Sequence, residues 1–107
     1  MEDLNRIELR GTVGNVSVIK LTETSVAHVS LRTDSAYKDK DGNAVIDTAW
    51  HYVTIWEGKD RPNPKDIGKG DRLHVTGRVH VNRFTGIDGG ERTFNEVIAN
   101  KVEIVKE

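Results

Sequence analysis

Apolar residues mark five stretches of this 107-residue chain, and in most of them they alternate with polar residues. The stretches cover residues 6–13, 26–33, 48–56, 73–84 and 92–105. A period of two sends successive side chains to opposite faces of a strand. Each stretch therefore predicts a β-strand with one face turned toward a core.

The connections between these stretches are polar and contain turn-forming residues. Residues 15–25 read as an irregular or partly stranded connection, residues 34–43 as a protruding loop or hairpin, and residues 88–90 as a turn. After the third stretch, Pro62 and Pro64 leave room for only a short helix.

Five strands with a short helix after the third are the plan of an all-β OB-fold, a partly open barrel with protruding hairpin loops. We expect one such domain over residues 1–107. An SH3-like barrel is the alternative, but it normally needs fewer residues and no insertion of this size after its third strand.

The third stretch carries the most informative pattern in the chain. Trp50, Tyr52 and Trp56 share one parity, which we expect to face outward. The opposite parity is predicted to face the core and carries Ala49, Val53 and Ile55. A row of exposed rings suits single-stranded nucleic acid, because every base has a face that can stack on an aromatic side chain. A cross-strand aromatic ladder or a subunit interface is the alternative, and this pattern alone leaves it open.

Two further aromatics favour the ligand interpretation. Tyr37 lies in the charged segment beside Lys38 and Lys40, and Phe84 follows Arg83 at the end of the fourth stretch. Candidate phosphate contacts on or beside the same predicted face are Lys38, Lys40, Arg78, Arg83 and Arg92, with Arg32 and Lys59 behind them.

Composition limits the alternatives. The net charge of −1 is low for a nucleic-acid binder, so binding requires a local basic surface rather than an overall basic protein. Without cysteine there is no disulfide framework, thiolate site or cysteine nucleophile. No signal peptide or apolar run of membrane-spanning length is present, so we expect a cytosolic protein.

No catalytic or cofactor site is expected from the sequence. His74 and His80 share a face but lie six residues apart, roughly 20 Å along a strand, which is too far to share a metal ion. His51 has inward parity and is predicted to be a hydrogen-bonded interior or interface residue.

Four segments of the chain resemble the DNA-binding domain of bacterial single-stranded DNA-binding proteins. They are residues 5–14, 28–40, 48–53 and 70–79, and the pair Trp50-His51 is the most specific element. The resemblance implies base stacking on Tyr37, Trp50, Trp56 and Phe84, with Tyr52 as the weakest member of the face. It also implies a homodimer or homotetramer, with His51 at a subunit contact and the first strand, which holds Ile7 and Leu9, helping to pair subunits.

The resemblance further implies binding and protection of single-stranded DNA in replication, recombination and repair. The sequence ends at Glu107 without the linker and acidic tail through which the family recruits enzymes, so we expect either a tailless member or a truncated chain. The resemblance therefore does not extend to the recruitment of those enzymes. The alternatives are a dimeric primosomal replication-restart accessory protein and an OB-fold used only for protein association.

Overall fold

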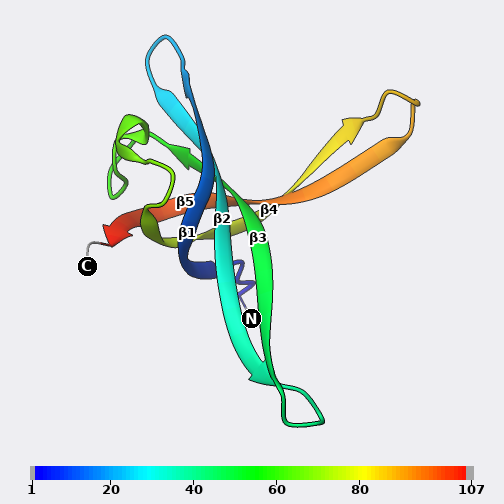
Figure 1. Ribbon diagram of the computed structural model, residues 1–107. Coiled ribbons are helices and arrows are strands. Elements are labelled where there is room, and N and C mark those ends of the chain that lie inside the picture. Colours follow the sequence, from blue (N-terminus) through cyan, green and yellow to red (C-terminus); the bar gives the residue numbers. More distant parts are fainter. Residues whose placement is uncertain (1, 106–107) are drawn as a thin grey trace.

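The computed structural model describes residues 2–105 as five strands and one short 3-10 helix. The elements are β1 (Ile7–Lys20), β2 (Ser25–Lys38), β3 (Ala44–Trp56), η1 (Pro64–Asp66), β4 (Arg72–Thr85) and β5 (Glu91–Val105). The strands close into a barrel in the order β1-β2-β3-β5-β4, as Figure 1 shows. The predicted all-β barrel is confirmed. The expectation about the C-terminal end of the chain lies outside the described residues.

Barrel closure rests on a short contact between β3 and β5. These strands run parallel and pair only through Val53 with Val97 and Thr54 with Ile98. All the other pairings are antiparallel. The barrel is therefore tightly joined around most of its circumference and narrowly joined at this one seam.

The β1–β2 hairpin projects from the barrel (Figure 1), and two further hairpins, β2–β3 and β4–β5, continue beyond their neighbours in it. β2 pairs with β1 only up to Arg32, whereas it pairs with β3 as far as Lys38. β4 pairs with β1 only between Arg72 and Gly77, whereas it pairs with β5 as far as Thr85. The outer halves of the β2–β3 and β4–β5 hairpins are thus two-stranded ribbons without a third neighbour.

The core is aliphatic and comes from all five strands and the segment after η1. Its buried residues are Val13, Ala27, Val29, Leu31, Val53, Ile55, Ile67, Leu73, Val75, Val97, Ala99 and Val102. Two residues predicted to face the core do not reach it, because Ala49 and Val81 lie on the projecting ribbons and are exposed. Alternation identified the side of the strand on which these residues lie. Both positions are beyond the end of the closed barrel, so no core lies beside them.

The connections differ in length from the sequence prediction. β1 runs on to Lys20 through the segment expected to be irregular, with a bulge between Val13 and Asn15. The polar segment after the second strand is a hairpin, of which residues 39–43 form the turn. The short helix forms where it was expected: Asn63 Oδ1 accepts a hydrogen bond from Lys65 N, and Pro64 is the first residue of η1. No helix of residues 2–105 is long and apolar enough to cross a membrane.

Candidate nucleic-acid interface

All six aromatic residues of the chain lie outside the core. Their exposed fractions range from 40% to 59%, and they are Tyr37, Trp50, Tyr52, Trp56, Phe84 and Phe94. The core is formed by aliphatic residues alone, so packing of the barrel interior does not explain where the aromatic residues lie. On β3 the predicted alternation is present, because Val53 and Ile55 are fully buried while the aromatic positions face outward.

Four rings form a continuous row across the outer face of the sheet, which we call the ring row: His28, Tyr52, Phe94 and Phe84. His28 stacks on Tyr52 with 5.7 Å between the ring centroids. Tyr52 meets Phe94 edge to face at 5.8 Å, and Phe94 meets Phe84 at 5.9 Å. The ring row crosses β2, β3, β5 and β4, so it runs across the strands and passes over the narrow seam of the barrel.

The ring row contains two residues that the sequence prediction missed. Phe94 bridges Tyr52 and Phe84, and His28 caps the row at β2. The parity of Phe94, opposite to that of the buried Val97, was a signal that could have identified it. Tyr52, expected to be the weakest member of the face, touches two other rings. The ladder and ligand interpretations are therefore compatible, because the rings contact one another and still present open surface.

Trp50 lies apart from the ring row and packs over Gly14 of β1. A Cβ atom built on Gly14 would come 2.4 Å from Trp50 Cζ3 and 2.6 Å from Cη2. Gly14 lies within the β1 bulge between Val13 and Asn15. The absence of a side chain there lets the six-membered ring of the indole lie directly on the β1 backbone.

Gly14→Ala is expected to push the Trp50 indole off this surface while the barrel stays folded, because the obstructing atoms are the movable end of a side chain. The emission maximum of tryptophan should shift, and any oligo(dT) affinity should fall toward that of Trp50→Ala. Gly68→Ala is the matched control, since a Cβ there would meet only Asp71 Oδ2 at 3.8 Å. Equal effects of the two substitutions would contradict this role for Gly14.

A buried carboxylate lies on the same outer face and joins three strands. Glu96 of β5 is 8% exposed, and its Oε2 accepts a hydrogen bond of 2.5 Å from the Thr54 hydroxyl of β3. Its Oε1 accepts a hydrogen bond from the Asn82 amide of β4. The bond to Thr54 reinforces the seam where only two residue pairs join β3 to β5, and the bond to Asn82 holds the Glu96 side chain against β4. Glu96 therefore contributes to barrel closure directly beside the ring row.

The candidate basic residues are spread over several parts of the molecule. Lys38 and Lys40 lie at the β2–β3 hairpin, Lys59 follows β3, Arg78 lies on β4, and Arg83 and Arg92 lie on the β4–β5 ribbon. Arg92 pairs with Asp88 at 3.0 Å, Arg83 approaches Glu91 at 4.0 Å, and Arg32 pairs with Asp34 at 3.5 Å. Among residues 2–105, no ion pair engages Lys38, Lys40, Lys59 or Arg78.

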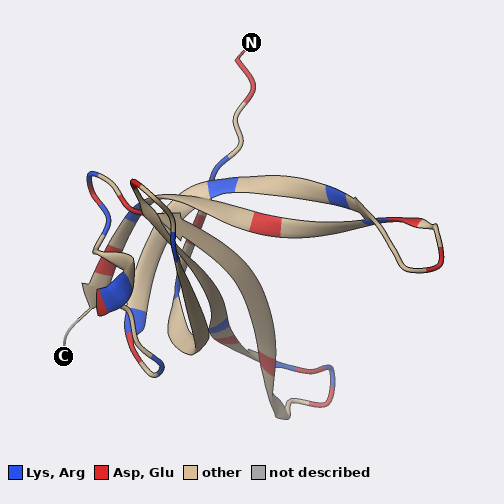
Figure 2. Cartoon of the chain, turned by 90° about the horizontal axis from the view of Figure 1, so that it is seen from above, with Lys and Arg blue, Asp and Glu red and all other residues tan. Residues whose placement is uncertain are grey.

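Figure 2 shows acidic and basic positions interspersed at the hairpin ends. The structure therefore does not bring the six candidates together in one basic stripe. It also separates Tyr37 from Phe84, which lie on different projecting hairpins (Figure 1). A ligand that touches both has to extend across the barrel between them.

The candidate subunit contacts cluster near the start of β1. His51 is half-buried, and its Nε2 lies 2.9 Å from the Thr33 hydroxyl. Ile7 and Leu9 are also half-buried and pack against the core. A cavity of about 300 Å³ is lined by Ile7 and His51 together with Trp50 and Tyr52. Ile7 of β1 and His51 of β3 thus line one cavity, although β1 and β3 are not paired in the barrel.

The remaining histidines show no metal-binding arrangement. His74 Nε2 lies 2.5 Å from Glu8 Oε2 across the β1–β4 pairing, and this hydrogen bond, with the charge of His74, lowers the pKa of the Glu8 carboxyl. Within residues 2–105, no group of three or more His, Asp or Glu side chains is placed to hold a metal ion.

Comparison with known proteins identifies the family of the chain. Residues 4–105 match the model of the single-strand binding protein family. The chain belongs to this family. A single-stranded DNA-binding protein of Xylella fastidiosa (strain Temecula1) is 33% identical over 104 residues, which cover 95% of this chain and 63% of that protein. A single-stranded DNA-binding protein of Xanthomonas axonopodis pv. citri is 32% identical, with 95% and 58% covered. The chain thus spans about three fifths of the length of these relatives.

Solved structures agree with the family. The single-strand binding protein of Plasmodium falciparum, solved in complex with single-stranded DNA, superposes with a TM-score of 0.79 at 25% identity, over 98% of this chain and 96% of that one. A deletion mutant of the Thermus aquaticus single-stranded DNA-binding protein gives a TM-score of 0.76 at 21% identity, over 96% of this chain and 51% of that one. The second likeness concerns the fold alone.

Proposed function

We propose that this chain binds single-stranded DNA with little sequence preference and keeps it unpaired during replication, recombination and repair in the bacterial cytoplasm. The observation that carries the proposal is the exposure of every aromatic residue on the outside of an aliphatic barrel. Family membership and the DNA complex of the Plasmodium relative support it. Bases stack on Trp50, Trp56 and the ring row, which reaches the β4–β5 hairpin at Phe84, and Tyr37 extends the contact onto the β2–β3 hairpin.

Stacking accounts for the lack of sequence preference. Every base offers a flat face, and stacking on an aromatic side chain contributes about 1 to 3 kcal/mol per base. Phosphate contacts from Lys38, Lys40, Lys59 and Arg78 position the strand and make binding dependent on salt. In this role the protein holds the strand and breaks no bond.

This proposal predicts similar affinities for single strands of different composition and a steep loss of affinity as salt rises. The measurement is fluorescence anisotropy of labelled oligo(dT), oligo(dC) and mixed-sequence DNA at two salt concentrations, beside RNA of equal length. Duplex DNA of the mixed sequence is the control, because its bases are already stacked. Equal affinity for the duplex would contradict base stacking as the source of binding.

We also propose that the protein acts as a homodimer or homotetramer, with Ile7, Leu9 and His51 near the subunit contact. Their half-burial in the single chain and their shared place near the start of β1 support it. A family OB-fold used only for protein association would bury the rings between subunits. Sedimentation with and without oligo(dT) separates these cases, since burial of the rings would prevent DNA binding by the assembled form.

A further inference from the structure

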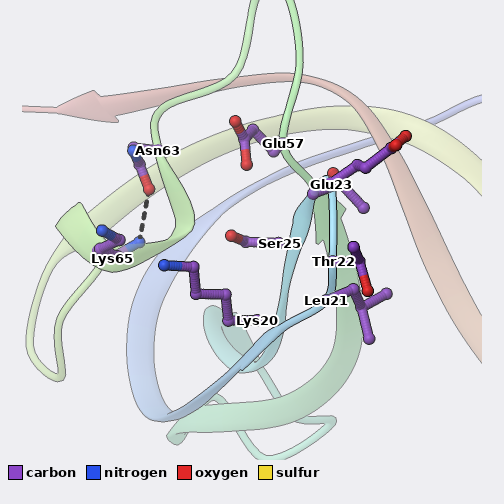
Figure 3. Close-up of a pocket in the computed structure, with 9 residues that line it drawn as sticks. Lys20, Leu21, Thr22, Glu23, Ser25, Glu57, Asn63 and Lys65 are labelled. Carbon is purple, nitrogen blue, oxygen red and sulfur yellow. Dashed lines mark hydrogen bonds between the residues drawn. The ribbon is translucent and has the colours of Figure 1, made fainter.

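A polar cavity of about 250 Å³ lies between the β1–β2 turn and the segment that follows β3 (Figure 3). Lys20 and Ser25 line it from the first side, and Glu57, Asn63 and Lys65 line it from the second. None of the sequence-based DNA contacts lies in it. The cavity begins one residue beyond Trp56, where β3 ends.

Four hydrogen-bond donors are available to a ligand in this cavity. Figure 3 shows the Lys20 side chain extended toward Lys65 and Asn63. Asn63 Oδ1 already accepts from Lys65 N at 3.1 Å, which leaves the amide nitrogen of Asn63 to donate. The two ammonium groups and the Ser25 hydroxyl are the other donors.

Ser25 is the most informative member of this set. It is 5% exposed, and its hydroxyl has no hydrogen-bond partner among residues 2–105. Figure 3 shows that the hydroxyl lies in the middle of the cavity. The hydroxyl opens onto the cavity, so it is free to donate a hydrogen bond to a ligand there.

Basic and acidic side chains lie on different sides of the cavity (Figure 3). In the described part of the chain no ion pair engages Lys20 or Lys65. Glu57 stands apart from the two lysines, and the Glu23 carboxylate points away from the cavity in Figure 3. Lysine, serine and asparagine are side chains that contact DNA phosphates. A cavity lined by two lysines, a serine and an asparagine therefore suits a phosphate group.

We propose that this cavity binds a backbone phosphate of the DNA strand, next to the nucleotide stacked on Trp56. This inference rests on the function proposed above. Two contacts connect the cavity with the stacking surface: Trp56 pairs with Val26 of β2, and Glu57 N donates to Ser25 O at 2.9 Å. A strand that leaves Trp56 toward the β1–β2 turn thus meets Lys20 and Lys65.

The test is the salt dependence of oligo(dT) binding by the double variant Lys20→Gln/Lys65→Gln. Loss of one phosphate contact on a single strand is expected to make the slope of log K against log salt shallower by about 0.7. Affinity at low salt should fall severalfold, while tryptophan quenching at saturation stays as in the wild type. Lys69→Gln/Lys101→Gln is the matched control, because it makes the same change in net charge at exposed lysines outside the cavity.

Ser25→Ala separates binding from folding. Removal of a hydroxyl without a partner should leave the stability of the barrel unchanged or slightly higher, while oligo(dT) affinity falls. An unchanged slope in the double variant, with normal wild-type binding, would overturn the cavity proposal alone. Failure of the wild type to bind oligo(dT) would instead overturn the proposed function and this inference with it.

A phosphate group that is not part of a DNA strand is the alternative ligand for this cavity. Titration with inorganic phosphate and with thymidine monophosphate, followed by the amide signals of Ser25 and Lys65, distinguishes the two. We expect weak binding of both. Tight binding of either one, unaffected by Trp56→Ala, would assign the cavity to a free ligand and contradict the DNA proposal.

Discussion

Trp50→Ala is expected to weaken oligo(dT) binding by about 5- to 150-fold, because loss of one stacking ring costs about 1 to 3 kcal/mol. Trp50 is the most exposed aromatic of the chain, at 59%, and it is supported by the backbone at Gly14. Its removal should therefore affect binding far more than folding. Anisotropy of labelled oligo(dT) measures the affinity, and urea unfolding of the free protein checks its stability.

Trp50→Phe is the matched control for this substitution. It retains a ring on the same strand position and should recover most of the lost affinity. If Trp50→Ala bound oligo(dT) as well as the wild type, Trp50 would have no stacking role. If both variants lost affinity equally, the hydrogen-bonding edge or size of the indole, rather than stacking, would be responsible.

Glu96→Ala is expected to lower the free energy of unfolding by about 1 to 3 kcal/mol, because it leaves Thr54 and Asn82 without their shared acceptor. The main chain cannot compensate at this seam, since only two residue pairs join β3 to β5. Urea denaturation of the free protein measures the effect.

Glu91→Ala is the control for Glu96→Ala. It removes the same side chain from the same strand, but Glu91 is exposed and lies 4.0 Å from its partner Arg83. Exposed ion pairs contribute little, so its stability should stay near that of the wild type. Equal destabilisation by the two substitutions would show that Glu96 does not reinforce the seam.

The sequence predicted what depends on local pattern. Alternation identified the five strands and the outward side of β3, and the Asn63-Pro64 pair located the short helix. These features follow from the period of side chains along one strand and from the local requirements of a helix start.

The features that the sequence could not predict depend on pairing between strands. Ala49 and Val81 have inward parity but are exposed, because their strands continue past the last neighbour in the barrel. The ring row depends on the strand register that brings Phe94 beside Tyr52, which the sequence does not reveal. The packing of Trp50 on β1 depends in the same way on the bulge at Gly14. The cavity at Lys20 and Lys65 joins segments far apart in the chain, so neither lysine stood out.

Titration of the wild-type protein with oligo(dT) at low salt, followed by tryptophan emission, tests the central claim most directly. Stacking of bases on Trp50 and Trp56 predicts saturable quenching that is reversed by added salt. Emission that stays unchanged throughout the titration would contradict the proposal that the exposed rings bind single-stranded DNA.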